Sequence, residues 1–106
     1  EFPDTQFAIV DSVVDLPNVT SLTFAAEQGS FLVGAAAAMR TTSCQIGFVG
    51  GVEVPLIQAF EAGFVQGAKA VAPDVEVDVD YISPAGDFSG FNDPARGTEV
   101  ARGQLD

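Results

Sequence analysis

The sequence predicts an α/β fold in which a parallel sheet carries helices on both faces. Short runs rich in β-branched residues alternate with helical patterns of about 10–15 residues, as in β-α-β units. The first run, Phe7–Val10, is continuously apolar, which is typical of a strand buried on both faces. Pro55 and Pro94 each stand where a helical pattern begins, a position that proline tolerates well.

The N-terminal part of the chain predicts two strands and a helix. Phe7–Val10 is the first strand, and turn residues at 15–18 separate it from a second strand at Val19–Phe24. A helix is expected over Glu27–Met39, where alanines favour helix formation. Because this helix is apolar nearly all round, we expect it to be buried, with Gly34 allowing close approach of a neighbouring backbone.

A polar break at residues 40–43 precedes the third predicted strand, Gln45–Val49, which ends at Gly50-Gly51. The next helix begins at Pro55 and carries one apolar face at spacings of three and four residues. It is expected to end at Ala72, because the residue before a proline disfavours helical geometry.

The C-terminal part predicts one more strand and one more helix. Residues 75–81 alternate strictly between apolar and polar or charged, the pattern of a half-exposed strand. A loop is expected at 83–90. Asn92 or Asp93 is the predicted N-cap of a final helix that starts at Pro94 and runs to Asp106.

Composition excludes several classes of function. Four Lys and Arg against fifteen Asp and Glu give a net charge of −11, which repels phosphate backbones, so nucleic acid is not an expected partner. The chain has no His, the commonest general base and metal ligand. One Cys allows neither an internal disulfide nor a Cys-based zinc site. No metal and no cofactor is predicted.

Ligands of parallel α/β sheets bind at the carboxyl ends of the strands, and three stretches occupy such positions. They are Asp11–Asp15, Gly50–Val54 and Ser83–Asn92. The second resembles a phosphate loop only faintly, because it lacks the Gly spacing and the Lys of known motifs. Its glycines allow a tight turn, and Glu53 is either a hydrogen-bond acceptor for a ligand or a favourable charge near a helix N-terminus.

The third stretch carries two aromatic residues, Phe88 and Phe91, in a Gly- and Ser-containing loop. An exposed planar side chain there could stack on a planar ligand. For each residue taken alone, packing against the end of the sheet is the simpler prediction.

The remaining polar residues are weak candidates for a site. Asp78 and Asp80 share one face of an alternating strand, and a solvated face predicts that pattern better than a metal site. Cys44 and the serines lack a His that could activate them, so no catalytic residue is predicted. Glu27 and Gln28 open a helix, where acidic residues are favourable in any case.

Several segments together resemble the basic membrane protein family, the substrate-binding lipoproteins of ABC transporters that include purine nucleoside receptors. The first is Glu27-Gln28-Gly29-Ser30-Phe31-Leu32-Val33-Gly34, which resembles an E-x-G-S-F-L-A-G segment. The others follow in the same order as in the family: Ile46–Gly51, Pro55–Ile57, Phe60–Phe64, Gly67–Val71, and Phe91–Gly97, which resembles F-N-D-P-A-K-G.

The resemblance implies a two-lobed type I periplasmic-binding fold with the ligand in the cleft between the lobes. We then expect residues 1–41 to belong to lobe one and 42–106 to be the first part of lobe two. Because lobes of this type are expected to have about 100–150 residues each, the chain would be the central part of a larger receptor. Its truncated sheets would leave strand edges open, with self-association as a risk.

The resemblance also implies where a ligand binds. The family holds purine nucleosides by stacking on aromatic residues, and Phe91 matches the aromatic residue of its F-N-D-P segment. Because the preceding loop is longer here, Phe88 is a second candidate for the same role. Glu53 and Gly51, in the turn after the third strand, are the other expected ligand-binding residues.

The function that this resemblance implies is solute binding without catalysis, for an ABC importer. The expected partners are a purine nucleoside-like small molecule and the transporter permease. The expected location is extracytoplasmic, with a lipid anchor elsewhere in the full-length protein. The alternatives are a small α/β enzyme using Asp11, Glu53 and Asp87, or a stand-alone interaction domain of flavodoxin-like architecture.

Overall fold

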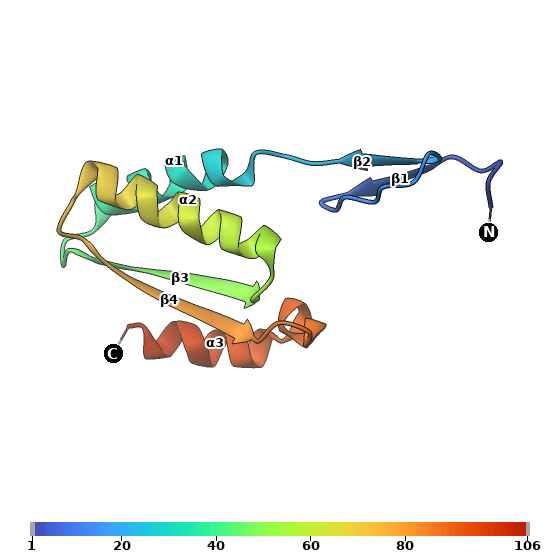
Figure 1. The fold of residues 1–106 in the computed structure, drawn as a ribbon. Helices are drawn as coiled ribbons and strands as arrows, with labels where there is room; N and C mark the ends of the chain where they lie inside the picture. Colours follow the sequence, from blue (N-terminus) through green and yellow to red (C-terminus); the bar gives the residue numbers. More distant parts are fainter. Residues whose placement is uncertain (1, 106) are drawn as a thin grey trace.

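A computed structural model of the chain describes residues 2–105. In chain order, the elements of this part are β1 (Phe7–Val10), β2 (Val19–Leu22), α1 (Ala26–Arg40), β3 (Gln45–Val52), α2 (Pro55–Val71), β4 (Glu76–Ser83), the 3-10 helix η1 (Phe88–Asn92) and α3 (Pro94–Gly103) (Figure 1). The predicted order of strands and helices is therefore confirmed.

The four strands form two separate sheets, and both strand pairs are parallel as predicted. In the first sheet β1 pairs with β2, with Phe7 opposite Val19. In the second β3 pairs with β4, with Gln45 opposite Glu76 and Val52 opposite Ser83. In each parallel pair the carboxyl ends of both strands therefore lie at the same end of the sheet, which is where a ligand site is expected.

The β3–β4 sheet is the middle layer of a three-layer body. Helices α1 and α2 lie over one of its faces and α3 lies over the other, so helices cover both faces (Figure 1). The core between the sheet and α2 is small. It contains Val52, Phe64, Ala68 and Val75, with the Phe48 and Phe64 ring centroids 5.7 Å apart.

Helices α1 and α2 cross at unusually short range. A Cβ atom on Gly34 of α1 would lie 1.9 Å from the Phe64 carbonyl oxygen, and one on Gly67 of α2 would lie 1.9 Å from the Phe31 carbonyl oxygen. Ser30 Oγ donates to the Phe60 carbonyl oxygen across the crossing, at 2.5 Å. The close approach predicted at Gly34 is therefore confirmed.

The expectation that α1 is buried nearly all round is wrong for this part of the chain. Its buried residues, Ser30, Gly34 and Ala38, form one narrow stripe of small side chains that faces α2. Leu32 and Met39 on other faces are 70% and 71% exposed. The physical reason is that, in the described residues, α1 packs mainly against α2 and touches β3 at only a few positions, so apolar composition alone does not bury its other faces.

The β1–β2 sheet lies apart from the three-layer body, joined to it by residues 23–25 (Figure 1). The chain extends over 57 × 30 × 16 Å with a radius of gyration of 16.9 Å, against about 13 Å for a compact chain of about 100 residues. Phe7, Val10 and Leu22 are exposed in this sheet. Helix α1 packs on α2, which groups residues 26–40 with the body.

Local details differ from the predictions at element ends. The second strand stops at Leu22 rather than Phe24, and the fourth extends to Ser83 rather than Tyr81. The loop after β4 contains η1. The final helix ends at Gly103, and Asp106 lies outside the described residues. None of the helices described between residues 2 and 105 has the length and hydropathy needed to cross a bilayer.

Candidate functional site

An exposed aromatic pair lies at the carboxyl ends of β3 and β4. Phe88 and Phe91 both belong to η1, which is the next element after β4 and contacts β3. Their side chains are 65% and 54% exposed, and their ring centroids lie 6.4 Å apart at an interplanar angle of 35°. The pair therefore offers planar apolar surface to a ligand, whereas the simpler expectation for each ring was packing.

Phe91 also contacts Gly51, which is predicted to lie in a turn but belongs to β3 because that strand continues to Val52. A Cβ atom on Gly51 would lie 2.6 Å from Phe91 Cδ1, so only glycine leaves room for this ring. The structure thus brings together Gly51 and Phe91, which are forty residues apart in the sequence. One edge of the Phe91 ring rests on β3 while the rest of its surface remains accessible.

The aromatic loop begins with a carboxylate turn. Asp87 Oδ1 accepts hydrogen bonds from the Ser89 backbone nitrogen at 3.0 Å and from Ser89 Oγ at 2.6 Å. These bonds hold the pKa of Asp87 below its ordinary value, with a smaller contribution from the charge of Arg96. The carboxylate form therefore stabilises the start of η1.

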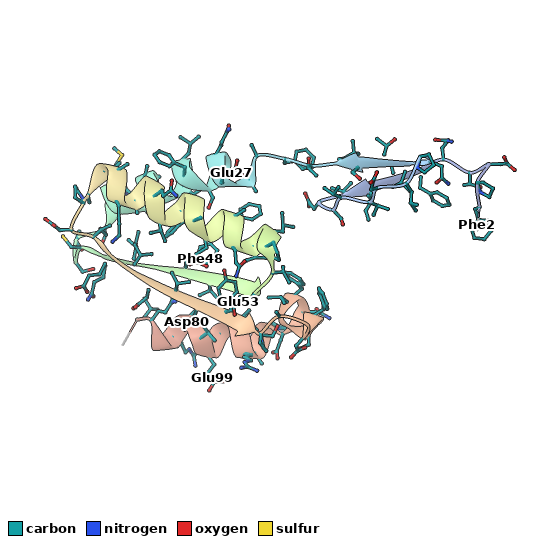
Figure 2. All side chains as sticks on the ribbon, in the orientation of Figure 1. Phe2, Glu27, Phe48, Glu53, Asp80 and Glu99 are labelled. Carbon is teal, nitrogen blue, oxygen red and sulfur yellow. The ribbon has the colours of Figure 1, made fainter. Side chains whose placement is uncertain are left out.

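Glu53 lies in the turn between β3 and α2, at the same end of the sheet as η1 (Figure 2). It is exposed, and its backbone nitrogen donates to the Ser83 carbonyl oxygen at 3.2 Å. An exposed carboxylate at a strand end can accept hydrogen bonds from a polar ligand. Glu53 is therefore available for the role expected of it.

Tyr81 is a half-buried residue near this end of β4. Its hydroxyl donates to Glu61 Oε2 at 2.5 Å, which ties β4 to α2. Burial raises the pKa of Tyr81 well above its ordinary range, and the hydrogen bond to Glu61 and the charges of Glu61 and Glu53 act in the same direction. Tyr81 is therefore a neutral hydrogen-bond donor at neutral pH.

The first candidate stretch lies at a different place. Asp11 is exposed with φ of 59°, and with Phe24 it borders a mainly apolar groove of about 610 Å³. Phe48 of β3 and Phe60 of α2 also line that groove. The groove follows α1, α2 and β3 and does not include the aromatic pair.

The structure also describes the residues that the sequence marks as weak candidates for a site. Asp78 and Asp80 are exposed, as a solvated face predicts, and Asp80 Oδ2 accepts a hydrogen bond from Gln104 Nε2 at 2.9 Å. Cys44 is exposed with φ of 60°. Glu27 lies in the first turn of α1. Within residues 2–105, no three His, Cys, Asp or Glu side chains are grouped as metal ligands.

Sequence reasoning missed Ser83. The sequence predicts a loop that starts at Ser83, but this residue is the last of β4 and only 2% exposed. The usable signal was the period-2 pattern of the strand, which continues to residue 83 and puts it on the same face as the apolar residues at 75, 77 and 79. Its hydroxyl lies under the aromatic loop, at the base of the candidate site.

Comparison with known proteins gives a family match over nearly the whole chain. Residues 1–103 match a family model described as ABC transporter substrate-binding protein PnrA-like. The ABC transporter nucleoside-binding protein BmpA of Lactococcus lactis subsp. cremoris is 47% identical over 93% of this chain and 27% of its own length. The CD4+ T-cell-stimulating antigen of Listeria monocytogenes is 48% identical, over 82% of this chain and 24% of its own length.

A more distant relative extends the same pattern. Basic membrane protein A2 of Borrelia garinii subsp. bavariensis is 36% identical over 93% of this chain and 29% of its own length. The chain thus spans about a quarter of the length of the curated relatives that it matches. The resemblance inferred from the ordered motifs is confirmed at the level of the family.

Proposed function

The chain belongs to the PnrA-like family of ABC transporter substrate-binding proteins, and from that premise we propose that it forms one wall of a cleft that binds a purine nucleoside-like solute. Proteins of this family bind solutes and are not enzymes, so the alternative of a small α/β enzyme is set aside. The ligand class is supported by the similarity to a relative named as nucleoside-binding.

The observation that carries the proposal is the exposed Phe88–Phe91 pair at the carboxyl ends of two parallel strands. A purine base presents a flat π face, and stacking on an aromatic side chain contributes about 1–3 kcal/mol per base in single-strand binding proteins. Glu53 and Gly51 lie at the same end of the sheet, where they would contact polar groups of the ligand.

The second wall of the cleft would come from the side of β1 and β2. The arrows of these strands run toward the three-layer body, while those of β3 and β4 run toward the side on which the β1–β2 sheet lies (Figure 1). The carboxyl ends of the two sheets thus face a common region. Ligand would enter between the two sheets and be enclosed by hinge closure, with no bond made or broken.

The division into lobes at residues 1–41 and 42–106 remains a prediction. The packing of α1 on α2 supports including α1 in the second lobe. In that case the connection between lobes lies at residues 23–25, between β2 and α1, and not in the polar break after α1.

The partners follow from the family role. A substrate-binding protein of an ABC importer hands its solute to the membrane permease, and we propose this partner for the whole protein. For the whole protein we also propose a location outside the cytoplasm, with a lipid anchor that holds it to the membrane. The net charge of −11 is in keeping with a partner other than nucleic acid.

The test is calorimetric titration of the whole protein with adenosine, guanosine, inosine, cytidine and uridine. We expect saturable binding of at least one purine nucleoside. Phe91→Ala should weaken that binding by about tenfold to a hundredfold, from the loss of a stacked base. The matched control is Phe2→Ala, a 67% exposed phenylalanine at the far end of the chain (Figure 2), which should bind like the wild type.

The two failures have different meanings. If no nucleoside produces heat or a thermal shift, the ligand class is wrong. If a purine nucleoside binds and Phe91→Ala binds it as tightly as Phe2→Ala does, the location of the site is wrong.

A further inference from the structure

Ser83 lies buried between the end of β3 and the aromatic loop, and we propose that it is a positioning residue that holds the Phe88–Phe91 pair in its ligand-ready arrangement. The inference rests on the proposed function, since it assigns how that binding surface is fixed. Ser83 would not touch the ligand. It would act through the backbone on which the two rings are mounted.

The hydroxyl of Ser83 has two acceptors within reach. Ser83 Oγ lies 2.5 Å from the Asp87 carbonyl oxygen and 3.3 Å from the Gly51 carbonyl oxygen. A hydroxyl has one proton to donate, and the shorter distance assigns it to Asp87. The side chain thus joins the residue that begins the aromatic loop to the last strand of the sheet, beside Gly51.

Gly51 and Gly90 are the close neighbours of the Ser83 hydroxyl. Gly90, between the two phenylalanines, is buried, and a Cβ atom there would lie 2.1 Å from the Gly51 carbonyl oxygen and 2.3 Å from Ser83 Oγ. We call Ser83, Gly51 and Gly90 the loop clamp. Because Gly51 also supports the Phe91 ring, the clamp fixes both the backbone and one edge of the aromatic surface.

The clamp accounts for a contrast in burial within one short segment. Ser83 and Gly90 are buried, whereas Phe88 and Phe91 are more than half exposed. Exposed rings on a free loop would lose conformational freedom each time a ligand bound, and that loss would weaken binding. Rings mounted on a fixed backbone avoid most of that cost, so removal of the clamp should lower ligand affinity without removing any ligand contact.

The experiment uses the whole protein with Ser83→Ala, and with Ser43→Ala as the matched control. Ser43 is an exposed serine ahead of β3, at the opposite end of the sheet, within hydrogen-bond distance of Thr41. Adenosine, guanosine and inosine are each titrated, and amide hydrogen exchange is followed at residues 84–92 and at 45–50. A second variant, Gly90→Ala, disturbs the clamp by crowding the Gly51 carbonyl oxygen and Ser83 Oγ, while the serine itself is kept.

In Ser83→Ala we expect amide exchange about tenfold faster at residues 84–92, with little change at 45–50. The variant should also bind the nucleoside about tenfold more weakly. Both changes correspond to the loss of one buried hydrogen bond. Gly90→Ala should change both quantities in the same direction. Ser43→Ala should match the wild type in both.

A double-mutant cycle separates positioning from a general loss of stability. In the Phe91→Ala background, Ser83→Ala should cost less affinity than it does alone, because one of the rings that it positions is gone. An equal loss in both backgrounds would overturn the proposal, as would unchanged exchange at residues 84–92. If the wild type binds no nucleoside, the proposed function fails, while the exchange measurement still decides whether Ser83 holds the loop.

Discussion

Replacing Gly34 with alanine should destabilise the protein, although alanine is the better helix former. In open space the change would favour the helix by about 1 kcal/mol. A Cβ atom on Gly34 would instead lie 1.9 Å from the Phe64 carbonyl oxygen, whereas real Cβ contacts essentially never fall under 3.0 Å. The obstacle is backbone, so the two helices would have to separate by more than about 1 Å.

The expected cost follows from what that separation disturbs. Overpacking of a close contact costs about 1–3 kcal/mol. Separation also stretches the hydrogen bond from Ser30 Oγ to the Phe60 carbonyl oxygen, which contributes about 1 kcal/mol. After the gain in helix propensity is subtracted, the free energy of unfolding should fall by about 2 kcal/mol.

The assay is urea unfolding followed by far-ultraviolet circular dichroism, with Gly29→Ala as the control. Gly29 lies in the same helix, and a Cβ atom there would have no neighbour within 4 Å. That variant should be more stable than the wild type by about 0.5–1 kcal/mol. If Gly34→Ala is as stable as the wild type, the close crossing of α1 and α2 does not exist as described.

Three further predictions concern other parts of the chain. Tyr81→Phe should lower the free energy of unfolding by about 1 kcal/mol at neutral pH, through loss of the bond to Glu61. The pKa of Tyr81 is about 10 in the unfolded chain and higher in the folded one, so the free energy of unfolding of the wild type should fall as pH rises past 10. Measured at a series of pH values, the free energy of unfolding of Tyr81→Phe should fall less. Cys44→Gly should raise the melting temperature, because glycine relieves a left-handed backbone that costs other residues about 1–2 kcal/mol; an unchanged or lower melting temperature would contradict this. The isolated 106-residue chain should self-associate in light scattering, since in residues 2–105 each strand pairs on one side only; a strictly monomeric chain at high concentration would count against open edges.

The sequence predicted the elements of the fold well because their signals are local. Pro55 and Pro94 both occupy the first turn of a helix, and Asp93 Oδ1 accepts a hydrogen bond from the Arg96 nitrogen as an N-cap should. The alternation over residues 75–81 gave β4 its exposed acidic face. Each of these features depends on side chains within a few positions of one another.

The arrangement of α1 depended on information that is not local. An apolar helix predicts burial, but how much of it is buried depends on which elements pack against it. Composition does not give that number of neighbouring elements. Gly34 was informative because a small residue implies a close neighbour. Its partner, the Phe64 carbonyl, could not be identified from spacing alone.

The candidate site was half predictable. A family resemblance points to Phe91 and a predicted turn points to Gly51, but the contact between them depends on the pairing of β3 with β4. Ser83 was missed because its importance lies in carbonyl groups of Asp87 and Gly51, which side-chain patterns do not reveal.

The most direct test of the central claim is a crystal structure of the whole protein grown with a purine nucleoside. The account predicts that the base stacks on Phe91 or Phe88 at the carboxyl ends of β3 and β4, with residues 51–53 at the edge of the ligand. A nucleoside bound with no contact to residues 51–53 or 88–91 would contradict it.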